Sequence, residues 1–147
     1  MARYLETIAS PRSASAAFDY LADFSSVAEW DPSAVRARML GEAPGEGTEF
    51  LVVVRFGGRE IELTYRTIAY EPPSRIVLRA ESPTVISEDT ITVRPVGGGC
   101  EITYDAALRP RGLMRIADPL LGLLFKRLGD NAAAGLRREL GQPARVT

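Results

Sequence analysis

Polar and apolar residues alternate at every second position over most of this chain, which is the pattern of half-buried β-strands. The seven strands predicted in this way span residues 3–9, 35–40, 48–56, 60–70, 75–81, 85–94 and 101–109. Short glycine- or proline-containing segments join consecutive strands, and Gly57-Gly58 is the strongest hairpin signal among them. The sheet is therefore expected to be an antiparallel meander.

Apolar residues recur at helical spacing in two other places. After the first strand they predict a short helix over residues 13–21 and a second short turn of helix over 23–27. Near the end of the chain they predict a helix over 113–140, or a short helix joined to a long one at Asp118-Pro119. A curled sheet can bury its apolar face against such a helix, and we expect a cavity to remain between the two.

Several short motifs occur in an order that resembles a known family. They are Ser10-Pro11 and residues 18–23 (FDYLAD), 27–32 (VAEWDP), 45–48 (GEGT), 70–75 (YEPPSR), 87–90 (SEDT) and 97–104 (GGGCEITY). Over residues 3–140 the chain resembles the START-like (SRPBCC) superfamily in its polyketide cyclase/dehydrase branch. The resemblance implies an α+β helix-grip fold, in which a curved seven-stranded antiparallel sheet wraps around a long C-terminal helix. It also implies two short helices between strands one and two, in a single ligand-binding domain over residues 1–147.

Composition narrows the chemistry. The 147 residues are 46% hydrophobic and 25% charged, which describes one ordinary globular domain. The net charge of -1 is unlike the basic footprint of a nucleic-acid-binding protein. The chain has no histidine and one cysteine, which argues against zinc sites and against Ser or Cys triads. We therefore expect no metal, no cofactor and no nucleic-acid partner.

The apolar segments of the chain are too short to serve as targeting or membrane-spanning segments. The N-terminal residues lack the apolar core of a secretory signal, so a cytoplasmic location is expected. Residues 112–125 form the longest weakly charged apolar stretch, but Arg115, Asp118 and Pro119 interrupt it, and spanning a bilayer takes about 20 residues. No stable membrane insertion is expected, and the sequence leaves open whether the chain forms a homodimer.

Strand phase predicts which side chains face the cavity, because side chains alternate between the two faces of a sheet. Trp30 lies outside the strands, and the resemblance places it at the cavity mouth. The alternative is that Trp30 packs the short helices against the sheet. The full set of expected ligand contacts is Trp30, Phe50, Val52, Val54, Leu63, Tyr65, Leu78, Asp89, Ile91, Tyr104, Leu121 and Phe125.

Asp89 is the one charged residue that strand phase places inside. The phase that buries Ile91 also turns Asp89 inward, and a buried carboxylate must be hydrogen-bonded, paired or protonated. Asp89 is therefore a candidate general acid or base, with Tyr65 and Tyr104 as the nearest candidate partners and catalytic hydroxyls. The alternative is that Asp89 lies near the strand end, partly wet and bonded to a tyrosine or a loop amide.

These features favour the binding of a small hydrophobic or aromatic molecule, lipid- or polyketide-like, between sheet and helix. A second interpretation is a polyketide cyclase, aromatase or dehydratase that uses Asp89 and a tyrosine. Aromatases of the resembled family commonly use an inward arginine, and the strands offer none unless a bulge turns Arg66 inward. A third interpretation is that residues 113–125 form a surface for a membrane or a partner chain.

Overall fold

A computed structural model describes residues 2–56, 58–112 and 118–141 of the chain. The elements in these ranges are β1 (Ala2–Ser10), α1 (Ala14–Ala22), the 3-10 helix η1 (Phe24–Ser26), α2 (Val27–Trp30), β2 (Ala34–Leu40), β3 (Glu49–Phe56), β4 (Arg59–Glu71), β5 (Arg75–Glu81), β6 (Val85–Val96), β7 (Gly99–Pro110) and α3 (Asp118–Leu140). The predicted α+β helix-grip fold, with seven strands and a long C-terminal helix, is confirmed. The part of the expected helix over residues 113–117 lies outside the described residues.

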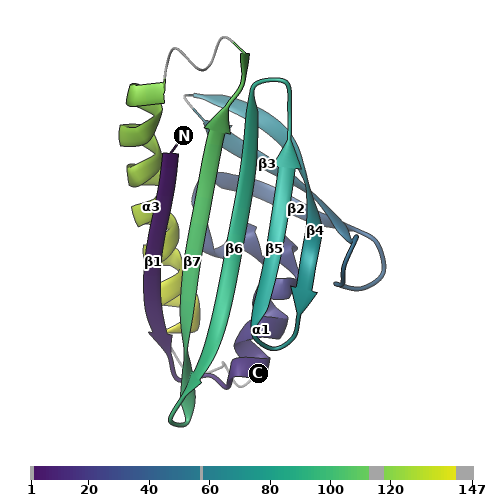
Figure 1. Cartoon of the computed structure of the whole chain (residues 1–147), viewed down its shortest axis with the longest axis vertical. Helices are drawn as coiled ribbons and strands as arrows, with labels where there is room; N and C mark the ends of the chain where they lie inside the picture. The colour runs from purple at the N-terminus through teal and green to yellow at the C-terminus, as the bar shows by residue number, and fades with distance from the viewer. Residues whose placement is uncertain (1, 57, 113–117, 142–147) are drawn as a thin grey trace.

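The strands form one antiparallel sheet in the order β1-β7-β6-β5-β4-β3-β2. From β2 to β7 each strand pairs with the next strand along the chain, and β1 joins the edge beside β7. The sheet curls so that β2 and β3 pass behind β5 and β6 in Figure 1. Strand phase predicted the concave face correctly, since its fully buried residues include Phe50, Val52, Ile76, Leu78, Ile91 and Ile102.

Short side-chain contacts determine where the small helices begin and end. Ser13 caps α1, because its Oγ accepts a hydrogen bond from the Ala16 amide at 3.1 Å. The second helical segment starts and ends later than the predicted range 23–27, since it covers η1 and α2. Asp23 accepts a hydrogen bond from the Ser25 amide at the start of this segment. Asp31 accepts one from the Ser33 amide at its end, and β2 follows directly.

The long helix α3 runs alongside β1 and also packs against α2 (Figure 1). Its polar contacts with β1 include a hydrogen bond from the Tyr4 hydroxyl to Asp130 Oδ1, at 2.8 Å, and one from Ser10 Oγ to the Leu140 carbonyl oxygen. Arg137 of α3 also pairs with Glu6 of β1 at 3.3 Å. The buried face of the helix includes Ala132, Ala133, Leu136 and Leu140. These contacts hold the C-terminal half of α3 against the rest of the molecule.

Two glycines allow α3 to approach its neighbours closely. A Cβ atom at Gly135 would overlap the carbonyl oxygen of Trp30 at the end of α2. A Cβ atom at Gly129 would overlap the ring of Tyr4 on β1. Only glycine fits at these two positions of the helix, so the short separation of α3 from α2 and from β1 depends on both glycines.

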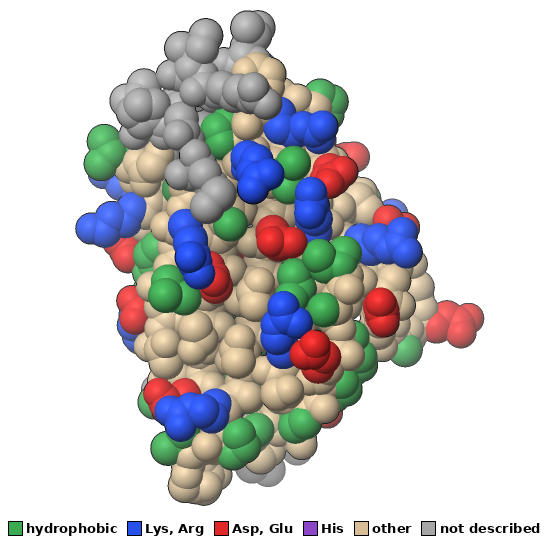
Figure 2. Space-filling model, in the orientation of Figure 1, with side chains coloured by type: hydrophobic (Ala, Val, Ile, Leu, Met, Phe, Trp, Pro, Cys, Tyr) green, Lys and Arg blue, Asp and Glu red, His purple; other side chains and the backbone are tan. Residues whose placement is uncertain are grey.

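The solvent-facing side of the sheet carries ion pairs. Arg3 and Asp105 join β1 to β7 at 2.7 Å, and Arg94 and Glu101 join β6 to β7. Figure 2 shows basic and acidic side chains interspersed over the face turned to the viewer. Charge of mixed sign is typical of a solvated surface.

Replacing Gly135 by alanine is expected to lower the free energy of unfolding by about 1–3 kcal/mol, because the backbone of α2 must move away from α3. Gly122→Ala on the same helix is the matched control, since its added Cβ meets nothing within 4 Å. That change should raise the stability by up to about 1 kcal/mol. Urea unfolding followed by Trp30 fluorescence measures both, and equal effects of the two substitutions would contradict the close contact.

Candidate functional site

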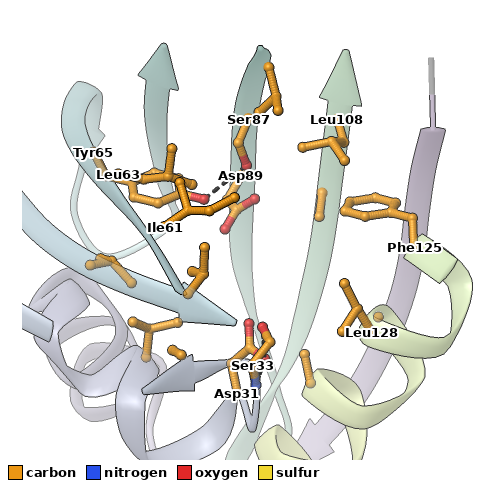
Figure 3. A pocket seen from close by; sticks show the side chains of 18 of the residues that line it. Asp31, Ser33, Ile61, Leu63, Tyr65, Ser87, Asp89, Leu108, Phe125 and Leu128 are labelled. Atoms are coloured by element: carbon orange, nitrogen blue, oxygen red, sulfur yellow. Dashed lines mark hydrogen bonds between the residues drawn. The ribbon is translucent and has the colours of Figure 1, made fainter. Parts of the chain in front are cut away.

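A cavity of about 100 Å³ lies between the concave face of the sheet, the short helices and α3 (Figure 3). The strands β3, β4, β6 and β7 form one wall, and the middle turns of α3, from Phe125 to Ala132, face them. The residues that line it are Phe24, Val27, Asp31, Ser33, Ala34, Val52, Val54, Arg55, Ile61, Leu63, Tyr65, Ser82, Thr84, Val85, Ser87, Asp89, Tyr104, Ala106, Leu108, Phe125, Leu128, Gly129 and Ala132.

Asp89 is the central polar group of the cavity. It lies in the middle of β6, opposite Leu78 of β5 and Ala106 of β7, and only 5% of its surface is exposed. Burial, followed by the charge of Asp31, raises the pKa of Asp89 to about 8. A hydrogen bond with Tyr104 opposes this rise, because it stabilises the ionised carboxylate. Of the two sequence interpretations, the structure supports a fully inward Asp89, with a tyrosine as its partner.

A second carboxyl group, that of Asp31, enters the cavity from the loop between α2 and β2 (Figure 3). Burial raises the pKa of Asp31, while the hydroxyl and the amide of Ser33 lower it. The Ser33 hydroxyl donates to Asp31 Oδ1 at 2.8 Å and the amide does so at 2.9 Å. The sequence interpretation missed Asp31 as a site residue, because the segment was taken only as the end of a helix. The spacing of Asp31 and Ser33, which is that of an Asx turn, was the available signal.

The two tyrosines predicted as partners of Asp89 have different roles. The Tyr65 hydroxyl of β4 forms a 2.9 Å hydrogen bond with Ser87 Oγ of β6 (Figure 3). This hydrogen bond passes over β5, which lies between the two strands. Tyr104 is the tyrosine that forms a hydrogen bond with Asp89. Burial, followed by the charge of Asp89, raises the pKa of Tyr65 and of Tyr104 well above the ordinary value. Both hydroxyls therefore remain protonated near neutral pH and can donate hydrogen bonds.

The structure brings together seven of the twelve expected ligand contacts: Val52, Val54, Leu63, Tyr65, Asp89, Tyr104 and Phe125. Trp30, Phe50, Leu78 and Ile91 are fully buried in the core and are not among the residues that line the cavity. Trp30 packs edge-on against Phe24 and Tyr104, with ring centroids 6.3 and 5.5 Å apart. Of the two interpretations of Trp30, packing in the core is the one that the structure supports. The side chain of Leu121 lies outside the described residues.

No lysine or arginine side chain enters the described interior of the cavity. Arg55 lies at its rim, where its side chain is 62% exposed and pairs with Glu60 at 3.3 Å. Arg66 stays exposed, because the bulge in β4 comes after it, between Thr67 and Ala69. The inward arginine expected of a ring-forming enzyme is therefore missing from the described part of the cavity.

The apolar segment 113–125 is only partly visible, since residues 113–117 lie outside the described ranges. Further along, Leu123 is 74% exposed, while Phe125 turns into the cavity (Figure 3). None of the helices in the described part of the chain is long and apolar enough to cross a membrane. Among the same residues, no group of three or more acidic or cysteine side chains is placed to hold a metal ion.

The sequence matches a protein family described as "Polyketide cyclase / dehydrase and lipid transport" over residues 1–141. The chain belongs to this family. The match spans nearly the whole length, from β1 to the end of α3, as the sequence motifs led us to expect. No curated protein sequence matches the chain significantly.

Solved structures confirm the fold. A START superfamily protein from Mycobacterium smegmatis shares 14% sequence identity and has a TM-score of 0.78, over 95% of this chain and 97% of that one. A protein from Thermus thermophilus, TTHA0849, shares 13% identity with a TM-score of 0.74, over 93% and 94% of the two chains. A conserved protein from Geobacillus kaustophilus shares 17% identity with a TM-score of 0.71, over 95% of each chain. At these identities the likeness concerns the fold alone.

The buried carboxyl of Asp89 should make stability depend on pH. Unfolded aspartate titrates near about pH 4, whereas the native pKa is about 8, so the folded protein holds the extra proton between these values. The contribution of Asp89 to the free energy of unfolding is fully present below about pH 4. It falls by up to about 1.4 kcal/mol per pH unit as the pH rises, and it stops falling above about pH 8.

Asp89→Asn should remove the part of the slope that Asp89 causes, because asparagine is neutral in both states and closely matches the shape of aspartic acid. A smaller slope remains from Asp31, whose pKa is also raised by burial. The exposed Asp19→Asn on α1 is the control and should leave the slope in place. Urea unfolding between pH 5 and pH 9 measures the effect. A slope as steep in Asp89→Asn as in the original protein would show that other groups cause it.

Proposed function

We propose that the protein binds a small hydrophobic molecule whose polar group faces Asp89 at the centre of the cavity. The observation that carries the proposal is the cavity itself, which combines mostly apolar walls with a few convergent polar groups. The polar groups are the Asp89 carboxyl and the protonated hydroxyls of Tyr65 and Tyr104. Membership of a family that includes lipid transport proteins supports the same function.

The size of the cavity limits what can sit wholly inside it. A space of about 100 Å³ is somewhat smaller than the engineered apolar cavity of about 150 Å³ that holds one benzene molecule. The enclosed part of the ligand is therefore no larger than a short branched chain or part of a single ring. A longer ligand would extend past Arg55 and Thr84, which are exposed and stand at the rim.

Binding in the cavity can be tested by placing a larger side chain in it from β7. Ala106 of β7 lines the cavity opposite Asp89, whereas Ala107 faces the other side of the sheet. Ala106→Leu should raise the Kd of benzyl alcohol at least tenfold, because the new side chain occupies the ligand's space. Ala107→Leu, the same substitution one residue away, should leave the Kd within about twofold of its original value.

Chemical-shift titration of the amide signals measures both Kd values and locates the site. The proposal fails if benzyl alcohol shifts no signals of the cavity residues, or if the two leucine variants bind it equally well. Thermal unfolding of the free variants provides the check that both remain folded.

Acid catalysis on a polyketide-like substrate is a second candidate, favoured by one observation. Asp89 carries a proton near neutral pH within reach of Tyr104, and a pKa close to the working pH suits proton transfer. In that case Asp89→Asn would abolish turnover of a β-polyketone while changing the Kd of a neutral ligand less than threefold. Full activity of this variant would remove Asp89 from the mechanism.

A further inference from the structure

Two carboxyl groups share the cavity without a positive charge to balance them. Asp31 comes from the loop before β2 and Asp89 from β6, and Figure 3 shows both directed into the same space. Arg55, the one basic residue among the described lining residues, is held at the rim by its ion pair with Glu60. A buried carboxylate is costly unless a cation or hydrogen bonds compensate it. Asp31 is compensated by its hydrogen bonds from Ser33 and Asp89 by holding a proton, so no basic side chain of the described lining competes with a cationic ligand for the two carboxyl groups.

Aromatic rings supply a second and independent feature. Phe24, Tyr65, Tyr104 and Phe125 line the same cavity, and the rings of Phe24 and Tyr65 have their centroids 5.1 Å apart. The negative faces of such rings attract cations, and desolvated aromatic cages are a recurrent way of holding ammonium groups. The aromatic rings and the carboxyl groups of this cavity thus both favour a positively charged ligand.

We propose that the bound molecule is an organic cation, a protonated or quaternary amine with a small apolar body, whose nitrogen lies between Asp31, Asp89 and the aromatic walls. This inference rests on the proposed function, because it names the class of ligand for the same cavity. A carboxylate ligand such as a fatty acid would instead bring a further negative charge beside two acidic groups. The cavity should reject it.

The pH dependence of binding separates a cationic ligand from a neutral one. The charged or titratable groups around Asp89 are Asp31, Tyr65 and Tyr104 inside the cavity, with Glu88 and Asp105 on neighbouring strand positions. Its α3 neighbours in the cavity, such as Phe125 and Leu128, carry no charge. A cation favours the ionised form of Asp89, so its affinity rises with pH up to about 8. A neutral ligand that accepts a hydrogen bond from protonated Asp89 would show the opposite trend.

Three probes of matched shape test the charge. Choline, 3,3-dimethyl-1-butanol and 3,3-dimethylbutanoate present a positive, a neutral and a negative molecule, each with a compact group of three methyls. At pH 8.5 choline should bind with a Kd at least tenfold lower than that of the alcohol, and the butanoate should not bind. Calorimetry gives the Kd values, and choline is permanently charged, so pH changes act on the protein alone. Between pH 8 and pH 6 the Kd of choline should rise, by at most tenfold per pH unit for one displaced proton.

Two cavity variants and one surface variant complete the test. Asp89→Asn and Asp31→Asn should each raise the Kd of choline at least tenfold and leave that of the alcohol within threefold. Asp19→Asn, on the exposed side of α1, should change neither. Trp30 fluorescence confirms that each variant is folded. If one cavity variant does not fold, the other still decides the question.

The two proposals fail in different ways. Binding of the alcohol at least as tightly as choline, or an affinity for choline that falls as the pH rises, would overturn the cation inference and leave the binding cavity in place. Absence of binding by all three probes would overturn both.

Discussion

The close contact between α3 and α2 is the constraint on which the cavity depends. Gly135 brings the helix backbone against the carbonyl oxygen of Trp30, and Gly129 does the same against the ring of Tyr4. Trp30 in turn packs on Tyr104, whose hydroxyl reaches Asp89. The C-terminal half of α3 is thus fixed to the core, and the cavity remains between the sheet and the middle of the helix, from Phe125 to Ala132.

The chemistry of the cavity follows from what surrounds Asp89. Apolar strands bury the carboxyl, Asp31 adds a second negative group, and the one basic residue among the described lining residues remains at the rim. Burial and like charge both favour the protonated acid, while Tyr104 favours the ionised form. The net effect is that Asp89 holds a proton near neutral pH, and a bound cation would favour its release. Ligand charge and the protonation of Asp89 are therefore coupled.

Strand alternation was sufficient to predict the strands and the inward direction of Asp89, because Ser87, Asp89 and Ile91 follow one strict period on β6. The helix-grip fold was predicted from the order of the sequence motifs and their resemblance to a known family. It was insufficient to say which inward residues reach the cavity. Alternation assigns a side chain to a face of the sheet but not to what covers it, and Phe50 lies against the ring of Phe24, 6.2 Å away. Asp31 was missed for a related reason, since a loop has no period and its place in the cavity depends on the tertiary fold.

The most direct test of this account is the pKa of Asp89, measured by following its carboxyl carbon by NMR between pH 3 and pH 10. Asp89→Asn assigns the signal, which disappears in that variant. A carboxyl enclosed between Leu78, Ala106 and Tyr104 should stay protonated through pH 7 and titrate with a pKa of about 8. A midpoint near about pH 4, the ordinary value for aspartate, would show that Asp89 is solvated and would contradict the cavity described above.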